Sequence, residues 1–181
     1  MRIETNNIII RDFQRKDAEN LYRIVREKNI FRFMPDWTEQ HDSPQAFWGY
    51  IDWHQSKKDS TNIYENKRYA IALPITDEMI GSVGMELEDT VNEVEVAYFM
   101  SEKYQRKGYT KEAINALVEW CFNVSDIKHL ILTIDCANIP SCHLAEKCGF
   151  ELFERRTPIG HKQHNMESDS YFYYRKYRDL P

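Results

Sequence analysis

The sequence has no long hydrophobic run. Hydrophobic residues make up 42% of its 181 residues, yet no segment approaches the roughly 20 consecutive apolar residues that a membrane-spanning helix needs. The first residues, from Met1 to Asn6, also lack the apolar stretch of a signal peptide. We therefore expect residues 1–181 to form a single cytoplasmic domain that has no membrane partner.

Cysteine and histidine are sparse, and neither is spaced like a metal site. The four cysteines form no C-x-x-C pair and the six histidines show no ligand spacing, so we expect no metal. In a chain that is not exported the thiols should be reduced. Cys121 falls on the apolar side of an expected helix. Cys142 lies at a helix start, where the pKa of a thiol tends to fall, so it is kept as a minor candidate nucleophile.

Clusters of positive charge and the common phosphate-binding motifs are also missing. The chain has 24 Lys and Arg against 29 Asp and Glu, a net charge of −5, and its basic residues are scattered. This argues against nucleic acid as a partner, because such binding needs clustered cations that neutralise phosphates. The chain has neither the Gly-Lys-Ser/Thr end of a Walker loop nor a Gly-x-Gly-x-x-Gly dinucleotide fingerprint.

What is present is a mixed order of strands and helices. Alternation and turn signals predict an antiparallel meander of three strands, Tyr69 to Pro74, Met79 to Leu87 and Glu93 to Met100. Further strands are expected at Ile8 to Phe13, His129 to Asp135 and Tyr171 to Tyr177, and helices at Asp17 to Arg26, Ser43 to about Lys57, Thr110 to Asn123 and Pro140 to Gly149. This order predicts an α+β fold with a mixed, mostly antiparallel central sheet flanked by helices.

The most informative segment is the loop Gln105-Arg106-Lys107-Gly108-Tyr109-Thr110, which leads from the strand ending at Met100 into a helix. The first amides of a helix have no intrahelical partner and, with the helix dipole, attract anions. Gly108 lets the backbone approach a ligand closely, and Arg106 and Lys107 add positive charge. The loop therefore predicts a phosphate or diphosphate site.

Polar residues on both sides of this loop fit the same site. In the strand before it, alternation places Glu93, Glu95, Ala97 and Phe99 on one face. Further along the chain, Asn138 and Ser141 stand between a strand and a short helix, where such residues commonly act only as caps. The two carboxylates followed by a small residue form a pattern that suits an active site on a sheet.

Three motifs, in this order and spacing, are similar to those of a known superfamily. Glu95-Val96-Ala97-Tyr98, Gln105 to Ala113, and Asn138-x-x-Ser141 with Glu146 to Phe150 resemble the GNAT superfamily of acyl-CoA-dependent N-acyltransferases, in particular its RimJ/RimL-like branch. The resemblance runs from about Ile8 to Tyr177, which is nearly the whole chain.

The chain departs from the family pattern at three positions. Thr110 stands where the family loop has Gly or Ala, and Ala97 stands where the strand motif usually has Gly. Ala145 occupies the position of a Tyr that many relatives use as the general acid. The first two changes bear on the geometry of cofactor binding, and the third removes one candidate acid.

The resemblance implies a GNAT-like fold and acetyl-CoA as the acyl donor. It implies that the pantetheine arm pairs with main-chain groups around Phe99 to Ser101. For Phe33, Met34 and Trp37 it implies an acceptor pocket, although core packing beneath a loop explains these residues as well. The implied cofactor-binding residues are Phe99, Met100, Ser101, Gln105, Arg106, Lys107, Gly108, Tyr109, Thr110, Asn138 and Ser141.

The expected reaction is direct transfer of an acetyl group to a primary amine, either a protein or peptide α-amine or a small amine such as a polyamine, amino acid or antibiotic. Glu95 is the candidate general base, unless it is only a solvated carboxylate. Glu93 is expected to raise the pKa of Glu95 or to hold a cationic substrate. Ser141 is the candidate acid for the departing thiolate.

Two questions of class and assembly stay open. Thr110 and Ala145 leave room for a non-catalytic CoA-binding regulatory module. The aromatic strand Tyr171 to Tyr174 suggests a possible homodimer formed by strand pairing.

Overall fold

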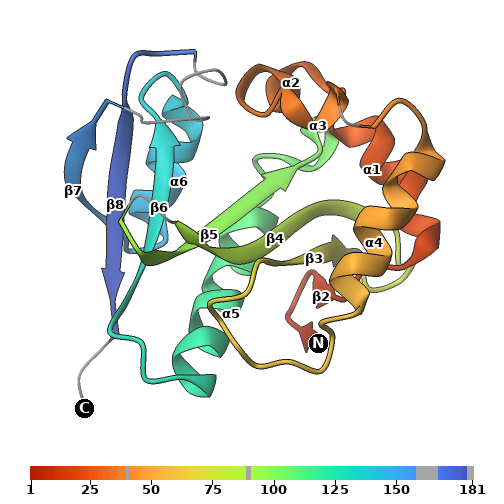
Figure 1. The fold of residues 1–181 in the computed structure, drawn as a ribbon, viewed down its shortest axis with the longest axis horizontal. Coiled ribbons are helices and arrows are strands. Elements are labelled where there is room, and N and C mark those ends of the chain that lie inside the picture. Colours follow the sequence, from red (N-terminus) through yellow and green to blue (C-terminus); the bar gives the residue numbers. More distant parts are fainter. Residues whose placement is uncertain (40, 89–90, 158–166, 179–181) are drawn as a thin grey trace.

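The computed structural model describes residues 1–39, 41–88, 91–157 and 167–178, and its described strands form one eight-stranded sheet (Figure 1). The spatial order is β1-β2-β3-β4-β5-β6-β8-β7. Every neighbouring pair is antiparallel except β5 and β6, which run parallel. The expected α+β fold with a mixed, mostly antiparallel sheet is therefore confirmed. The strands are β1 Arg2–Glu4, β2 Ile9–Arg11, β3 Lys67–Ala72, β4 Met79–Glu88, β5 Glu93–Met100, β6 His129–Asp135, β7 Glu151–Arg156 and β8 Tyr171–Tyr177.

The described helices lie close to their expected positions, with one exception. They are α1 Ala18–Ile24, α2 Lys28–Phe33, α3 Asp36–Glu39, α4 Phe47–Gln55, α5 Tyr109–Val124 and α6 Ile139–Lys147. Short 3-10 turns precede α1, α4 and α5. The interpretation of Phe31 to Trp37 as irregular was wrong, because this stretch belongs largely to α2 and α3. With six and four residues, these helices are too short for the hydrophobic period of 3.6 residues to repeat twice, so the sequence pattern does not reveal them.

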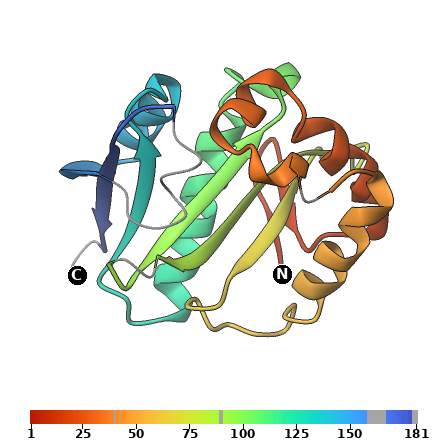
Figure 2. The same cartoon turned by 45° about the horizontal axis from the view of Figure 1, so that its top comes forward.

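Helices cover both faces of the sheet because the strands alternate (Figures 1 and 2). In β5, Val94, Val96 and Met100 pack in a core that also contains residues of α5 and α6. Phe99 points to the opposite face and packs in a second core with residues of α1 and α4. Cys121 is buried in the first core, as its place on the apolar side of α5 indicates.

The parallel strands β5 and β6 separate soon after they begin. Their register contains one aligned pair, Glu95 with Ile131, and the two strands diverge toward their carboxyl ends in Figure 1. β5 nevertheless stays paired with β4 as far as Met100. The edge of β5 beyond Glu95 therefore faces an opening instead of a hydrogen-bonded neighbour strand.

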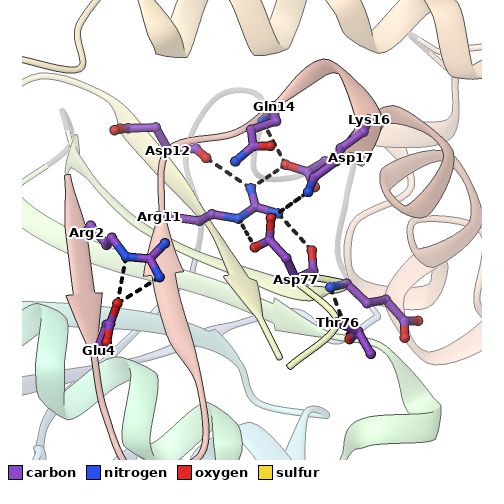
Figure 3. Close-up of polar contacts among 10 residues, drawn as sticks. Arg2, Glu4, Arg11, Asp12, Gln14, Lys16, Asp17, Thr76 and Asp77 are labelled. Atoms are coloured by element: carbon purple, nitrogen blue, oxygen red, sulfur yellow. Dashed lines mark hydrogen bonds and ion pairs between the residues drawn. The ribbon is translucent and has the colours of Figure 1, made fainter. Parts of the chain in front are cut away.

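A buried ion pair fixes the N-terminal segment to the sheet (Figure 3). The Arg11 guanidinium donates to both carboxylate oxygens of Asp17, with N–O distances of 2.7 and 2.9 Å. Its Nε donates to Asp77 in the β3–β4 turn at 2.7 Å. The Arg11 and Asp17 side chains are only 4% and 2% exposed. This network joins β2, the start of α1 and the β3–β4 turn.

The sequence analysis suggested that the C-terminal strand could pair with its copy in a homodimer. The strand was wrong for this role, whereas the homodimer itself stays a prediction. β8 lies between β6 and β7 and pairs with both. Its backbone is already hydrogen-bonded on each side, so it offers no free edge to a partner. On this side of the sheet the outermost described strand is β7.

Candidate active site

The loop before α5 has the backbone shape of an anion site. Gly108 is the N-cap of α5 and has a φ of 87°, in the left-handed region. Arg106 is also left-handed, with a φ of 61°. Left-handed residues alternating with ordinary ones turn successive N–H groups toward one concave side. A side chain at position 108 would meet no atom within 4 Å, so space for a ligand is open there.

The first amides of α5 supply the donors. The amide of Glu112 donates to the carbonyl of Gly108 at 3.0 Å, which is the first hydrogen bond of the helix. The amides of Tyr109, Thr110 and Lys111 precede it and have no intrahelical acceptor. Arg106 and Lys107 are exposed beside them. These groups fit a diphosphate, and Thr110 lies in the first turn, where its side chain does not interrupt the helix.

Of the backbone groups expected to contact the pantetheine arm, some face β4 and others face the opening toward β6. The Ser101 amide donates to Ile80 of β4 at 2.9 Å, and a Cβ on Gly81 would lie 2.5 Å from the Phe99 carbonyl oxygen. The main chains of Phe99 and Ser101 therefore face β4. Since backbone groups alternate along a strand, those of Tyr98 and Met100 face the opening toward β6. The Met100 carbonyl accepts from the Gln105 side chain at 3.0 Å.

The carboxylate of Glu27, the N-cap residue of α2, also holds Ser101. Glu27 accepts from the Ser101 hydroxyl at 2.7 Å and from the Glu102 amide at 2.5 Å. In the other direction, the amide of Asn29 in α2 donates to the Glu102 carboxylate at 2.8 Å. The side chain and amide of Ser101 are thus both used inside the protein, and its expected cofactor contact finds no support in this geometry.

A cavity of about 310 Å³ lies where β5 and β6 separate. It brings together the candidate base, the candidate acid and the expected acceptor wall, although these come from distant parts of the sequence. The sequence-predicted residues in its lining are Phe33, Met34, Trp37, Glu95, Asn138 and Ser141.

The Glu95 carboxylate is fixed by hydrogen bonds and is not freely solvated. Glu95 is only 9% exposed. One carboxylate oxygen accepts from the Thr133 amide at 3.0 Å and also from the Thr133 hydroxyl. Thr133 lies on β6, so the carboxylate bridges the two strands just where they part. The hydrogen bonds fix its orientation toward the cavity.

Glu93 lies elsewhere. Its carboxylate accepts from Arg175 at 2.5 Å and pairs with His129 Nε2 at 2.9 Å, and it is not among the residues that line the cavity. The expectation that Glu93 binds substrate or acts on Glu95 therefore finds no support in this geometry. Its partners on β6 and β8 make it a link between strands.

Asn138 and Ser141 form the expected helix start. The Asn138 side chain caps α6 by accepting from the Ser141 amide at 3.3 Å. The Ser141 hydroxyl lies close to that of Tyr98. Burial raises the pKa of Tyr98, and the interaction with Ser141 offsets only part of that rise. The Tyr98 hydroxyl has no hydrogen bond of normal geometry within the described part of the chain, so the contact with Ser141 is weak.

Cys142 does not behave as its helix position indicates. Burial raises the pKa of its thiol, and the side chain packs in the core with α5. The idea of a lowered pKa was wrong because desolvation outweighs the helix dipole. Among the described residues no cluster of His, Cys, Asp and Glu could hold a metal ion, and no described helix is long and apolar enough to cross a membrane.

Several lining residues were not predicted as site residues from the sequence, among them Arg68, Tyr98 and Thr133. Arg68 is a buried cation in β3, paired with Glu86 at 2.5 Å. A charged residue inside an apolar strand pattern was the available signal for it. Tyr98 stands inside the family motif Glu95-Val96-Ala97-Tyr98. Thr133 carries no signal, because its role depends on the pairing of β5 and β6.

The sequence is similar to those of known and inferred acetyltransferases. Residues 7–151 match the sequence profile of the acetyltransferase (GNAT) domain. The chain is 26% identical over 176 residues to the uncharacterized N-acetyltransferase YnaD of Bacillus subtilis, covering 96% of this chain and 95% of YnaD.

Solved structures share the fold. A ribosomal-protein alanine acetyltransferase from Vibrio fischeri has a TM-score of 0.80 at 16% identity, covering 99% of this chain and 97% of that one. A microcin self-immunity acetyltransferase, solved with acetyl-CoA and AMP, has a TM-score of 0.73 at 17% identity, covering 96% and 94%. These two likenesses show the fold. The chain therefore belongs to the GNAT acetyltransferase family, as an N-acetyltransferase that uses acetyl-CoA as its acyl donor.

Proposed function

We propose that residues 1–181 form one acyltransferase domain that moves an acetyl group from acetyl-CoA directly to the primary amine of a small molecule or of a protein or peptide N-terminus. The observation that carries the proposal is the order of three features along β5 and the loop after it. The hydrogen-bonded Glu95 carboxylate comes first. The backbone edge that faces the opening comes next, and the anion-binding loop at Gly108 follows.

The residues fit two parts of the cosubstrate, its diphosphate and its pantetheine arm. The first amides of α5, with Arg106 and Lys107 beside them, would hold the diphosphate. The backbone of Tyr98 and Met100 would pair with the pantetheine arm as an added strand does. Bound in this way, acetyl-CoA supplies an acetyl group activated as a thioester.

Glu95 is the proposed general base. Near pH 7 an alkylamine is mostly protonated, and its nitrogen needs a free lone pair to attack a carbonyl carbon. Glu95 removes the proton directly or through a water molecule, while Thr133 keeps its carboxylate in place. The C–N bond then forms and the C–S bond breaks.

The same strand and α6 supply the remaining groups. An amide of Tyr98 or Met100 at the open edge would stabilise negative charge on the carbonyl oxygen. Ser141, which lines the cavity, would give a proton to the departing thiolate. The Tyr98 hydroxyl, from β5, lies beside that of Ser141, so Tyr98 is a second candidate proton source.

The test is acetyl transfer to a panel of amines and peptides, with mass detection of the product. Glu95→Gln should lower kcat by about 10²- to 10⁴-fold, and Ser141→Ala should lower it less. Coenzyme A should bind both variants as it binds the wild type. Glu119→Gln, an exposed position on α5, is the matched control. Unchanged turnover in both site variants would remove the assignment.

The non-catalytic alternative has no support in the comparisons. It predicts that coenzyme A binds but that no free thiol is released from acetyl-CoA when amines are added. Thiol release that depends on the amine separates the two functions.

A further inference from the structure

A second cavity, of about 320 Å³, adjoins the first. Trp37, Arg68 and Glu86 line both, so they form a shared wall. The remaining lining includes Tyr50 and His54 of α4. The second cavity therefore lies on the α4 side of the acceptor wall, next to the proposed site of transfer.

Polar atoms without partners gather in this lining. Within the described residues, Tyr50 Oη, His54 Nε2, Asn66 Oδ1 and Arg68 Nη1 are buried and have no hydrogen-bond partner. All four residues line the second cavity. A buried polar atom without a partner is costly, and most such atoms in folded proteins are satisfied. Four of them around one cavity leave hydrogen-bonding positions that a bound molecule can fill.

The atoms are mostly donors. His54 Nδ1 accepts from the Arg68 amide at 3.2 Å, and burial, with the charges of Arg68 and Lys57, lowers the pKa of His54 to about 3. The ring is therefore neutral near pH 7 and carries its hydrogen on Nε2. Arg68 Nη1 can only donate, and the Tyr50 hydroxyl can donate. Asn66 donates to Glu86 at 2.9 Å, which leaves its Oδ1 as the acceptor of the group.

The nearby carboxylates are already occupied. One oxygen of Glu86 accepts from Arg68 and the other from Asn66. Asp135, which lines the first cavity, accepts from the amides of Ala137, Glu167 and Ser168. A polycationic acceptor would need free carboxylates, whereas a carboxylate-bearing acceptor needs the donors that are present.

We propose that the second cavity binds a free carboxylate of the acceptor, so that the substrate is an amino acid or a similar small zwitterion whose amine reaches Glu95 in the first cavity. The placement of the acceptor amine at Glu95 rests on the proposed function. The carboxylate accepts from Arg68, His54 and Tyr50. Aromatic rings form part of the cavity wall. The ring centroids of Trp37 and Tyr50 are 5.3 Å apart, and those of Tyr50 and His54 are 4.4 Å apart. Such a wall suits an apolar side chain on the acceptor.

Kinetics with three acceptors of one skeleton test the proposal: phenylalanine, phenylalaninamide and phenethylamine. We expect kcat/KM to be at least about tenfold higher for phenylalanine than for the other two. Tyr50→Phe removes one hydroxyl and should lower kcat/KM for phenylalanine by about tenfold through KM, with kcat and the amide reaction little changed. Tyr64→Phe, at an exposed tyrosine, is the control. Equal use of the three acceptors would overturn the proposal.

A binding measurement separates this inference from the proposed function. Trp37 and Trp53 line the cavity, so their fluorescence can be titrated with N-acetylphenylalanine and with its amide in the absence of acetyl-CoA. Preference for the carboxylate, weakened by Tyr50→Phe, supports the site even if no amine is acetylated. Transfer to amines without this preference leaves the function intact and rejects the carboxylate site, in which case water satisfies the four atoms.

Discussion

At the scale of single residues, the site depends on groups whose environment gives them one role. Gly108 adopts a left-handed backbone with open space where a side chain would be. Glu95 is fixed by Thr133 and buried at the point where two strands part. The sequence predicted both Gly108 and Glu95 as site residues. It did not predict the partner of Glu95, because no local pattern places residue 133 beside residue 95.

Substitution of Gly108 separates charge from backbone strain. Asn and Asp have nearly the same shape and both tolerate a positive φ better than most residues. Gly108→Asp, which adds a negative charge beside a diphosphate, should weaken coenzyme A binding by about tenfold more than Gly108→Asn. Calorimetry of coenzyme A binding measures the difference. Equal dissociation constants in the two variants would contradict an anion site at this loop.

Tyr98 offers a second test at the residue scale. If it shares the proton donation with Ser141, Tyr98→Phe combined with Ser141→Ala should lower kcat by more than either change alone, without loss of coenzyme A affinity. The measurement is a double-mutant cycle on kcat. A double variant no slower than Ser141→Ala would assign Tyr98 to packing only.

At the scale of elements, the sequence predicted the longer strands and helices more accurately than the short strands and helices. α5 was expected from Thr110 to Asn123 and spans Tyr109–Val124, because its apolar period continues for several turns. β1, at Arg2–Glu4, was not expected, and α2 and α3 were not distinguished from loop. Such short elements are stabilised by tertiary contacts, which leave little trace in local sequence.

The Arg11 network gives a prediction for the joined elements β2 and α1. Arg11→Met leaves the buried Asp17 carboxylate without its cationic partner and should lower the free energy of unfolding by about 3–5 kcal/mol. The control is Arg2→Met, since Arg2 forms an exposed pair with Glu4 (Figure 3) and exposed pairs contribute about 1 kcal/mol or less. Urea unfolding measures both. Similar losses in the two variants would contradict the structural role of Arg11.

At the scale of the whole molecule, the order of the strands determines the site. β8 enters between β6 and β7, which the sequence could not reveal because strand order depends on long-range pairing. The homodimer stays a prediction, and β7 is the described edge on that side of the sheet. The alternation along β5, in contrast, was predicted and confirmed, since it assigns Val94, Val96 and Met100 to one core and Phe99 to the other.

Asp135 ties the end of β6 to the segment before β8, which makes stability depend on pH. Burial raises the pKa of Asp135, but hydrogen bonds from Ser168 and from the amides of Ala137, Ser168 and Glu167 outweigh it, so the pKa is lowered. A lowered folded-state pKa contributes stability above the unfolded value of about 3.9, and this is lost as the pH falls through the folded value.

The corresponding variant is Asp135→Asn. Urea unfolding at neutral pH should show it to be less stable than the wild type, and the difference should shrink as the pH drops below about 4. Asp169→Asn, at an exposed carboxylate, should change little at either pH. A difference that is constant across this range would rule out the carboxylate charge as the source of the stability.

The contacts of Glu27 and Glu102 have one more consequence. They connect α2, which carries part of the acceptor wall, to the segment that leads into the coenzyme loop. A shift of α2 on acceptor binding would be passed through these hydrogen bonds to the donor side. Thermodynamic linkage would then require each substrate to change the affinity of the other by the same factor, so each dissociation constant would depend on the occupancy of the other site.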